Sequence, residues 1–188
     1  FPPYQHQYDC WNTLLHEKYD GKPMAICVTT GTGSGKTECF MMPLVYDLAK
    51  NYQSGQIQAV FLYPLNALME DQKERLEKML ENIERSMGVK LTYTVYNGDL
   101  PDEVPSKNDT SEDAERIRRK IDMIRGLKTD KHGQPELDSN GNKQYKYPRM
   151  VYTRKDVRRK DAAPNILLTN PTMLEYILLR KSDENLIN

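Results

Sequence analysis

The chain has 188 residues, a length that fits one domain of about 100–200 residues with a buried core. Lysine plus arginine and aspartate plus glutamate balance at 27 each, so the net charge gives no argument for a nucleic-acid-binding protein. No window approaches the roughly 18 apolar residues of a membrane span, and no secretory leader opens the chain, so we predict a cytoplasmic protein with no membrane partner.

The first part of the chain alternates between helical and strand patterns. Aromatic and leucine side chains recur at intervals of three and four over residues 4–19, which predicts an amphipathic helix. The short apolar run 24–29 has β-branched members and predicts a strand buried on both faces. Helical spacing returns over 37–51, and a second buried strand is predicted at 59–63.

The rest of the chain continues this alternation. A long helix is predicted over 66–87 and ends at Gly88. Strands are predicted at 90–96 and 165–169, with a helix over 172–179 after the last one. Strands that alternate with helices of this length predict an α/β fold in which a parallel sheet is flanked by helices in three layers.

A polar stretch at about 100–163 separates the third and fourth of these strands, and we predict that the sheet does not need it. Thr110-Ser-Glu-Asp113 resembles a capping box and precedes an apolar stripe over 117–127, so one amphipathic helix is predicted there. Residues 128–147 are charged and rich in turn formers, which predicts a mobile loop or an exposed hairpin at Asn140-Gly141.

A glycine-rich string, Thr30-Gly-Thr-Gly-Ser-Gly-Lys-Thr37, lies between the predicted strand at 24–29 and the predicted helix over 37–51. Strand, loop and helix in this order are the context of a P-loop. Glycine permits backbone conformations closed to other residues, so successive N–H groups and the helix N-terminus can point at phosphate oxygens. The string therefore predicts a site for a nucleoside triphosphate, against the alternative of a glycine-rich turn with an incidental lysine.

Two side chains of the string have predicted catalytic roles. Lys36 supplies a cation at the β- and γ-phosphates, and the Thr37 hydroxyl is a ligand for Mg²⁺. At the start of the following helix, the Glu38 carboxylate is explained better by the helix dipole than by activation of water. The three cysteines of the chain show no Cys-x-x-Cys or Cys/His spacing, which favours reduced thiols over a zinc site.

Further blocks follow the glycine-rich string, and their order is typical of one family. They are Phe61-Leu-Tyr-Pro-Leu-Asn-Ala-Leu-Met-Glu-Asp-Gln72, Val95-Tyr-Asn-Gly-Asp99 and Ile166-Leu-Leu-Thr-Asn-Pro-Thr-Met-Leu-Glu175. They resemble motif Ia, the block after it, and the block that closes the nucleic-acid face of the first RecA-like domain in superfamily 2 DEAD/DEAH-box helicases. Upstream, Tyr4-Gln-His-Gln7 resembles the Q motif of these helicases, whose glutamine reads the adenine edge.

Within this superfamily the chain looks like the large bacterial helicases of the Hrq/MrfA type, which include helicases of the phage-defence systems DISARM and Druantia. The strings that carry this resemblance are Thr29-Thr-Gly-Thr-Gly-Ser-Gly-Lys-Thr-Glu38, Tyr63-Pro-Leu-Asn-Ala-Leu68, Thr153-Arg-Lys-Asp-Val-Arg158 and Pro164-Asn-Ile-Leu-Leu-Thr-Asn170. The resemblance implies a RecA-like P-loop NTPase domain, ATP with Mg²⁺ as cofactors, and nucleic acid, in particular DNA, as a partner.

The resemblance also implies two sets of site residues. The expected nucleotide contacts are Tyr4, Gln7, Thr32, Gly33, Ser34, Gly35, Lys36, Thr37 and Glu38. The expected nucleic-acid contacts are Pro64, Leu65, Asn66, Gly98, Asp99, Arg154, Arg158, Thr169, Asn170 and Pro171. Many of the second set follow predicted strand ends, and ligands of open parallel sheets gather at the carboxyl ends of strands.

Each of these assignments has a structural alternative. Gln7 could be a surface glutamine of a helix, and the basic run 149–160 could be a solvated charged face. Asn97-Gly98 is by itself a good turn, and residues 169–172 are a good helix cap. A residue that caps a helix can also contact a ligand, so both interpretations can hold together.

The resemblance further implies parts that this sequence does not contain. One is the acidic Asp-Glu-x-His block that holds Mg²⁺ and orients the attacking water, and the other is a second RecA-like domain with an arginine finger. Asp183-Glu184 follows polar residues rather than a buried strand, so we do not assign it as that block. We therefore expect residues 1–188 to be a fragment, an N-terminal RecA-like ATP-binding domain that ends before the DEAH block and is inactive alone.

The predicted function is the ATP-binding half of an ATP-dependent DNA helicase or translocase, in phage defence or DNA repair. ATP would close two RecA-like domains across the P-loop, and hydrolysis would reopen them and shift the grip on nucleic acid. The alternatives are a nucleotide-gated clamp that binds nucleic acid without hydrolysis, and an RNA helicase or protein-translocating ATPase with the same core. Subunits of a defence system are further expected partners.

Overall fold

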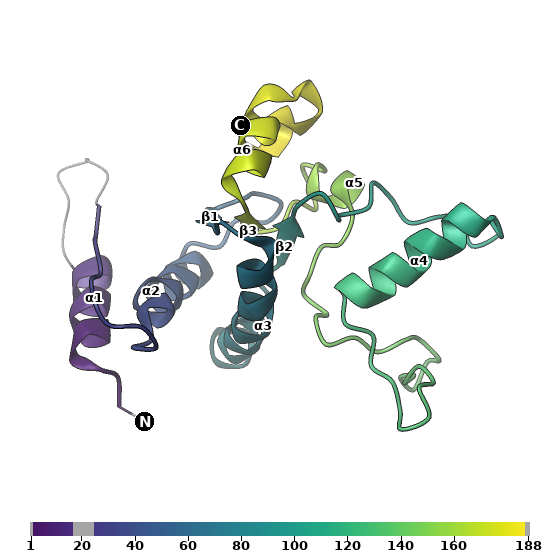
Figure 1. Ribbon diagram of the computed structural model, residues 1–188. Helices are drawn as coiled ribbons and strands as arrows, with labels where there is room; N and C mark the ends of the chain where they lie inside the picture. The colour runs from purple at the N-terminus through teal and green to yellow at the C-terminus, as the bar shows by residue number, and fades with distance from the viewer. Residues whose placement is uncertain (1, 17–24, 187–188) are drawn as a thin grey trace.

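The computed structural model describes residues 2–16 and 25–186. Figure 1 shows its elements in chain order, which are α1 (Gln5–His16), α2 (Lys36–Lys50), β1 (Ala59–Leu62), α3 (Asn66–Met87), β2 (Tyr93–Tyr96), α4 (Glu112–Ile124), α5 (Arg154–Val157), β3 (Ile166–Thr169), α6 (Pro171–Leu179) and the 3-10 helix η1 (Lys181–Leu186). None of the helices among these residues is long and apolar enough to cross a membrane. The helix predicted over 4–19 is confirmed for 5–16, and its last three positions lie outside the described residues.

The strands form one parallel sheet in the order β1-β3-β2. The central strand β3 pairs with both neighbours, and Ile166 lies opposite Ala59 on one side and Tyr93 on the other. All three strands run in the same direction, so their carboxyl ends meet at one edge of the sheet. The predicted parallel α/β sheet is confirmed.

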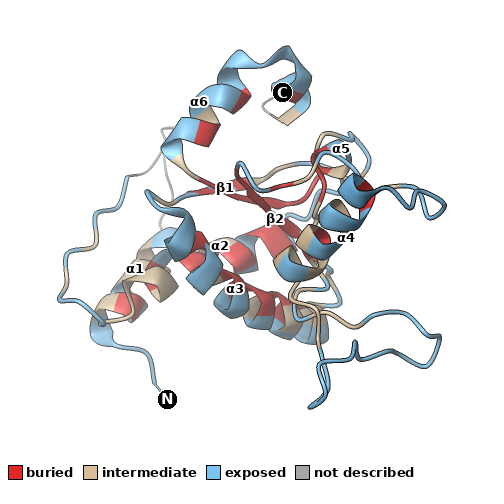
Figure 2. Ribbon diagram, turned by 45° about the vertical axis from the view of Figure 1, so that its right-hand side comes forward, coloured by how far each residue is buried: buried red, intermediate tan, exposed pale blue. Residues whose placement is uncertain are grey.

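Helices cover both faces of this sheet, with α2 and α3 on one side and α6 on the other (Figure 2). Ile166 and Leu168 of β3 belong to a core cluster with side chains of α2 and α3. Leu167 alternates to the opposite face and packs with Ile177 of α6 in a second cluster. Burial on both faces explains the unbroken apolar run of β3 and confirms the three-layer arrangement.

The predicted strand at 24–29 is wrong for its described part. Residue 24 lies outside the described residues, and residues 25–30 form no strand. This segment runs beside α1 and apart from the sheet (Figure 1), and the Ile26 side chain is 38% exposed. A β-branched apolar run becomes a buried strand only if another strand lies next to it, and within the described residues no strand pairs with the outer edge of β1.

The stretch 100–163 is not as dispensable to the sheet as predicted. Near its end, the Val151 N–H donates to the Tyr93 carbonyl at 2.8 Å, so this segment covers the outer edge of β2. The Arg149 guanidinium pairs with Glu77 of α3 at 2.6 Å and anchors the same segment. An edge strand exposes unpaired backbone groups, and this returning segment satisfies those of Tyr93 at the start of β2.

Within this stretch, α4 and the loops after it project away from the sheet (Figure 1). α4 begins within the predicted capping box, where the Ser111 hydroxyl accepts a hydrogen bond from the Ala114 N–H at 3.2 Å. Further on, Leu137 pairs with Lys143 across a tight turn, and Gly141 adopts a φ of 79° there. The predicted hairpin at Asn140-Gly141 is therefore present.

Candidate nucleotide and nucleic-acid site

The glycine-rich string forms the turn that leads into α2. Gly33 and Gly35 have φ values of 77° and 75°, in the left-handed region that favours glycine, and α2 begins at Lys36. The Lys36 ammonium folds back and donates to the carbonyl oxygens of Thr30 and Gly31 at 2.9 and 2.6 Å. The tip of the loop is exposed. Glycine backbone and one cation are therefore presented together at a helix start, an arrangement that fits phosphate groups.

Helix α1 packs against this loop. Gln7 is only 8% exposed; its Nε2 donates to the Gly35 carbonyl at 3.1 Å and its Oε1 accepts from the Tyr4 N–H at 2.9 Å. His6 Nε2 lies 2.9 Å from the Ser34 carbonyl oxygen, and the exposed Tyr4 ring stacks on His6. Gln7 is thus buried against the loop and is not the surface glutamine of the alternative interpretation.

The remaining expected nucleotide contacts surround the start of α2. Thr32 is exposed, Thr37 is half-buried, and the Ser34 hydroxyl is hydrogen-bonded within the loop. Glu38 points instead toward α3, where its carboxylate accepts a hydrogen bond from Arg75 at 3.1 Å. The structure therefore gathers the loop residues and Gln7 in one place, but it assigns the Glu38 side chain to the contact between α2 and α3.

The other set of expected residues lies at the carboxyl edge of the sheet. Asn66 begins α3 just after β1, Gly98 and Asp99 follow β2, and Asn170 caps α6 after β3. Asn170 Nδ2 donates to Asn66 Oδ1 at 3.0 Å, so the ends of β1 and β3 meet directly. The exposed residues beside them are Pro64, Leu65 and Pro171. This edge presents backbone and amide groups, which suit contacts with sugar and phosphate more than with bases.

Two residues of this edge also serve the fold. Thr169 is fully buried, and its hydroxyl donates to the Tyr96 carbonyl at 2.8 Å. Asn170 Oδ1 accepts from the Met173 N–H at 2.8 Å, which is the helix-cap contact of the structural alternative. Thr169 therefore holds the sheet together, whereas Asn170 caps α6 and still presents its amide at the edge.

The basic run 149–160 is largely engaged within the protein. Arg154 is buried, and it donates from Nε to the Leu100 carbonyl at 3.0 Å and from Nη2 to the Asn97 carbonyl at 2.9 Å. Arg158 pairs through Nε with the fully buried carboxylate of Asp183 at 2.6 Å. These two arginines hold the loop after β2 and the end of the described chain in place, so they are not simply a solvated charged face.

Asp183 joins Arg158 to the sheet. Its Oδ1 also accepts a hydrogen bond from the Tyr96 hydroxyl at 2.9 Å. Burial, with this hydrogen bond to Asp183, raises the pKa of the Tyr96 phenol. Burial opposes the charged form of Arg158, but the contacts with Asp183 and Tyr96 outweigh it and raise the pKa of the guanidinium. Asp183 is therefore an internal partner of an arginine, which agrees with its exclusion as the acidic block.

Comparison with known proteins identifies the family. The sequence model of the DEAD/DEAH box helicases matches residues 4–128, more than half of the chain. The chain belongs to this family. The match includes the Gln7 segment, the glycine-rich loop and the residues that follow β1 and β2 at the carboxyl edge.

This DEAD/DEAH box helicase chain is similar to two curated proteins. Druantia protein DruE of Escherichia coli (strain UMEA 4076-1) is 27% identical over an alignment that covers 98% of this chain. The uncharacterized ATP-dependent helicase YprA of Bacillus subtilis (strain 168) is 30% identical over 55% of this chain. The chain spans 12% of the length of each relative. No solved structure matches it. The resemblance to helicases of the Hrq/MrfA type, Druantia helicases among them, is confirmed.

Sequence reasoning missed two contacts to the nucleotide loop of this helicase domain. Beside the His6 contact to Ser34, Trp11 Nε1 donates to the Glu38 carbonyl at 2.8 Å. Helical spacing identified Trp11 only as a residue of the apolar face of α1. The indole N–H, a donor that needs a partner when buried, was the available signal for a specific contact.

Gly35→Ala is expected to destabilise the domain and to weaken nucleotide binding. The φ of 75° costs an alanine about 1–2 kcal/mol, and its Cβ would lie 2.5 Å from Gln7 Nε2. We expect a lower midpoint of urea unfolding and a higher Kd for ATP. Gly31→Ala is the matched control for the added methyl group, because no atom lies within 4 Å of its Cβ position. Equal unfolding midpoints for the two variants would contradict the prediction.

Proposed function

We propose that this chain is the ATP-binding part of an ATP-dependent DNA helicase or translocase. The observation that carries the proposal is the loop at residues 30–37, in which Lys36 and two left-handed glycines lie at the start of α2 with Gln7 against them. The family supports it, as do the names of the relatives, one an ATP-dependent helicase and the other a Druantia protein.

The proposal also covers the rest of the polypeptide, its cellular role and its partners. Residues 1–188 would be the first RecA-like domain of a longer polypeptide, with the polar stretch 100–163 inserted in it and a second RecA-like domain as its partner. The protein would act in the cytoplasm, in phage defence or DNA repair, with subunits of a defence system as further partners. The relative whose match covers 98% of this chain is named a Druantia protein, which supports the defence role.

In this proposal the loop binds the triphosphate through its backbone and through Lys36. The Lys36 ammonium exchanges the carbonyl oxygens of Thr30 and Gly31 for β- and γ-phosphate oxygens, and its charge becomes paired. The N–H groups of the glycine turn donate to the same phosphates, and Gln7 holds the turn through the Gly35 carbonyl. Thr37 is suited to hold Mg²⁺, which when bound neutralises charge on the phosphates.

The carboxyl edge of the sheet is the proposed nucleic-acid surface. The amides of Asn66 and Asn170 and the backbone at Gly98 can hold sugar and phosphate without reading bases, as a protein that steps along any sequence requires. Arg154 is fixed by backbone carbonyls, so we propose that it adds positive potential to this edge from behind, and that Arg158, whose charge is paired with Asp183, holds the neighbouring chain in place.

The test of the proposed function is ATP turnover by the full-length protein, with and without single-stranded DNA. Turnover stimulated by DNA supports the motor. ATP binding without turnover, whether DNA is present or absent, overturns the motor in favour of the nucleotide-gated clamp. Stimulation by RNA in place of DNA would identify an RNA helicase, and turnover that responds to neither polymer would favour a protein-translocating ATPase.

A further inference from the structure

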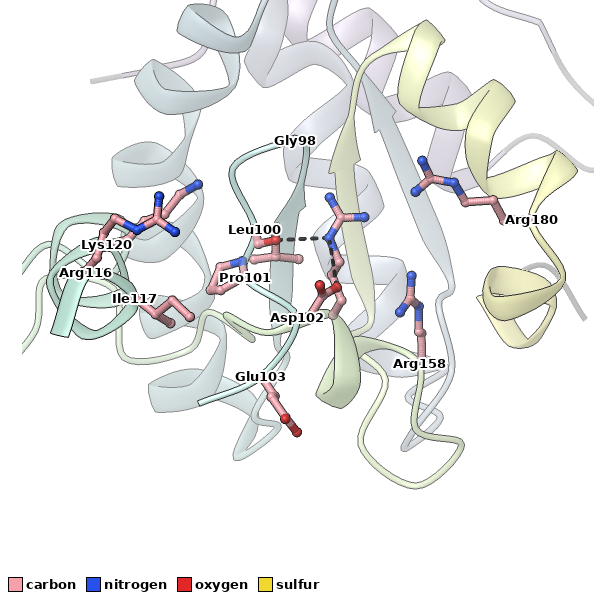
Figure 3. Close-up of a pocket in the computed structure, with 11 residues that line it drawn as sticks. Gly98, Leu100, Pro101, Asp102, Glu103, Arg116, Ile117, Lys120, Arg158 and Arg180 are labelled. Carbon is pink, nitrogen blue, oxygen red and sulfur yellow. Dashed lines mark hydrogen bonds and ion pairs between the residues drawn. The ribbon is translucent and has the colours of Figure 1, made fainter. Parts of the chain in front are cut away.

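A cavity of about 550 Å³ lies between α4 and the end of α6. Figure 3 shows Arg116 and Lys120 of α4 on one side of it and Arg158 and Arg180 on the other. Arg154 also contributes to the lining, from α5. The lining thus brings the cations of α4 together with those of α5 and of the ends of α5 and α6, more than 30 positions later in the sequence.

The carboxylates of this lining are already occupied by cations. Glu103 accepts a hydrogen bond from Lys155 at 2.8 Å, and Asp102 lies 3.7 Å from Arg154. Of the five cations in the lining, four also have a carboxylate within 4 Å, namely Asp113, Asp99, Asp102 and Asp183. Arg180 forms no ion pair among the described residues. An anion in the cavity would therefore pair with Arg180 and compete with carboxylates for the other cations.

The cations of α4 can change partners at little cost. Arg116 pairs with Asp113 at 3.0 Å, with the two side chains 76% and 82% exposed. Lys120 lies 3.3 Å from Asp99, and its side chain is 36% exposed. Exposed ion pairs contribute little stability, so a phosphate can replace either carboxylate. Arg154 and Arg158, in contrast, are held by buried partners and form a rigid floor.

The shape and position of the cavity favour a nucleic-acid strand over a small anion as its ligand. Its volume exceeds that of one phosphate group, and its cations stand on two opposite walls (Figure 3). Between the walls lie Leu100 and Pro101, an apolar surface against which a sugar can pack. Gly98, at the carboxyl edge of the sheet, also lines the cavity, so the cavity continues the surface proposed for nucleic acid.

We propose that this cavity binds the phosphodiester backbone of a nucleic-acid strand, and that α4, from the polar stretch 100–163, supplies one wall of the path. The inference rests on the proposed function, since it extends the nucleic-acid surface from the sheet edge onto α4. Arg116 and Lys120 contact phosphates on one wall, and Arg180 contacts them on the other. The guanidinium of Arg180 lies over the Tyr176 ring, 4.9 Å from its centroid, which holds it at the rim.

The test is equilibrium binding of a fluorescent single-stranded DNA to the full-length protein, measured by anisotropy at several salt concentrations. Arg116→Gln combined with Lys120→Gln removes two phosphate contacts. We expect a Kd that is about tenfold higher near 0.1 M salt, and a slope of log K against log salt that is shallower by about 1.4. ATP turnover without DNA is expected to stay unchanged, since neither residue lies near the glycine-rich loop.

The matched control is Lys78→Gln combined with Arg85→Gln. These residues form exposed ion pairs within α3, as Arg116 does within α4, but they do not line the cavity. An unchanged Kd and slope in the α4 variant, with DNA binding intact in the wild type, would overturn this inference and leave the proposed function standing. An equal loss in the control would also overturn it, because net charge alone would then explain the effect.

Two further outcomes separate the ligand classes. Competition by polyglutamate as effective as by the oligonucleotide would overturn the phosphodiester assignment, because the cavity would then accept an acidic polypeptide. A wild-type protein that binds neither DNA nor RNA would overturn the proposed nucleic-acid function itself.

A variant of the opposite wall tests whether both walls contact one DNA strand. Arg180→Gln is expected to raise the Kd for DNA, as the α4 variant does.

Discussion

Replacing Lys36 by alanine is expected to lower DNA-stimulated ATP turnover of the full-length protein by at least about 100-fold. The Lys36 ammonium is the cation of the glycine-rich loop, and it lies within 2.6 and 2.9 Å of two loop carbonyls that phosphate oxygens can replace. Without it, the charge that develops on the phosphates during transfer has no ammonium beside it. The measurement is steady-state phosphate release at saturating DNA, together with the Kd for ATP.

Lys50→Ala is the matched control for this variant. Lys50 is the last residue of α2, as Lys36 is the first, and its ammonium lies over the Tyr46 ring, 5.1 Å from the centroid. Turnover by Lys50→Ala is expected to equal that of the wild type, and both variants should keep the wild-type unfolding midpoint. Turnover by Lys36→Ala near the wild-type rate would remove Lys36 from the catalytic loop and the loop from the mechanism.

The regular parts of the fold could be predicted from the sequence because their signals are local. In α3, Leu76, Leu80 and Ile83 recur on one side, and Gly88 ends the helix with a φ of 70°, so the predicted bounds 66–87 agree with the structure. The glycine-rich loop is equally local, since its left-handed glycines and its lysine are adjacent in the chain. Its contact with Gln7, 28 positions away, was implied only by the family resemblance.

The roles of the charged residues could not be predicted, because their partners are distant in the sequence. Arg149 pairs with Glu77, 72 positions earlier, and Arg158 pairs with Asp183, 25 positions later. A basic run has the same appearance in a sequence whether water, carboxylates or phosphates neutralise it. The gathering of cations around the cavity likewise depends on α4 lying opposite the end of α6, and no local pattern records that arrangement.

Asp183→Ala is expected to lower the free energy of unfolding by about 2–4 kcal/mol. The carboxylate is fully buried and holds Arg158 at 2.6 Å and the Tyr96 hydroxyl at 2.9 Å. Its removal leaves the Arg158 side chain, which is only 26% exposed, without its charge partner, and it leaves the Tyr96 hydroxyl without an acceptor. Urea unfolding followed by circular dichroism measures the loss. Because Arg158 lines the cavity, we also expect weaker DNA binding below the unfolding transition.

Two comparisons make this prediction specific to the buried pair. Asp161→Ala removes a carboxylate at the same distance from an arginine, 2.6 Å from Arg159, but both side chains are exposed, so the unfolding midpoint should hardly change. Combining Asp183→Ala with Arg158→Ala removes both charges, and the double variant should lose less stability than the sum of the two single losses, since no unpaired charge remains. Strict additivity would show that the two side chains do not depend on each other, and the loss in Asp183→Ala would then come from the hydrogen bond to Tyr96 and not from the ion pair.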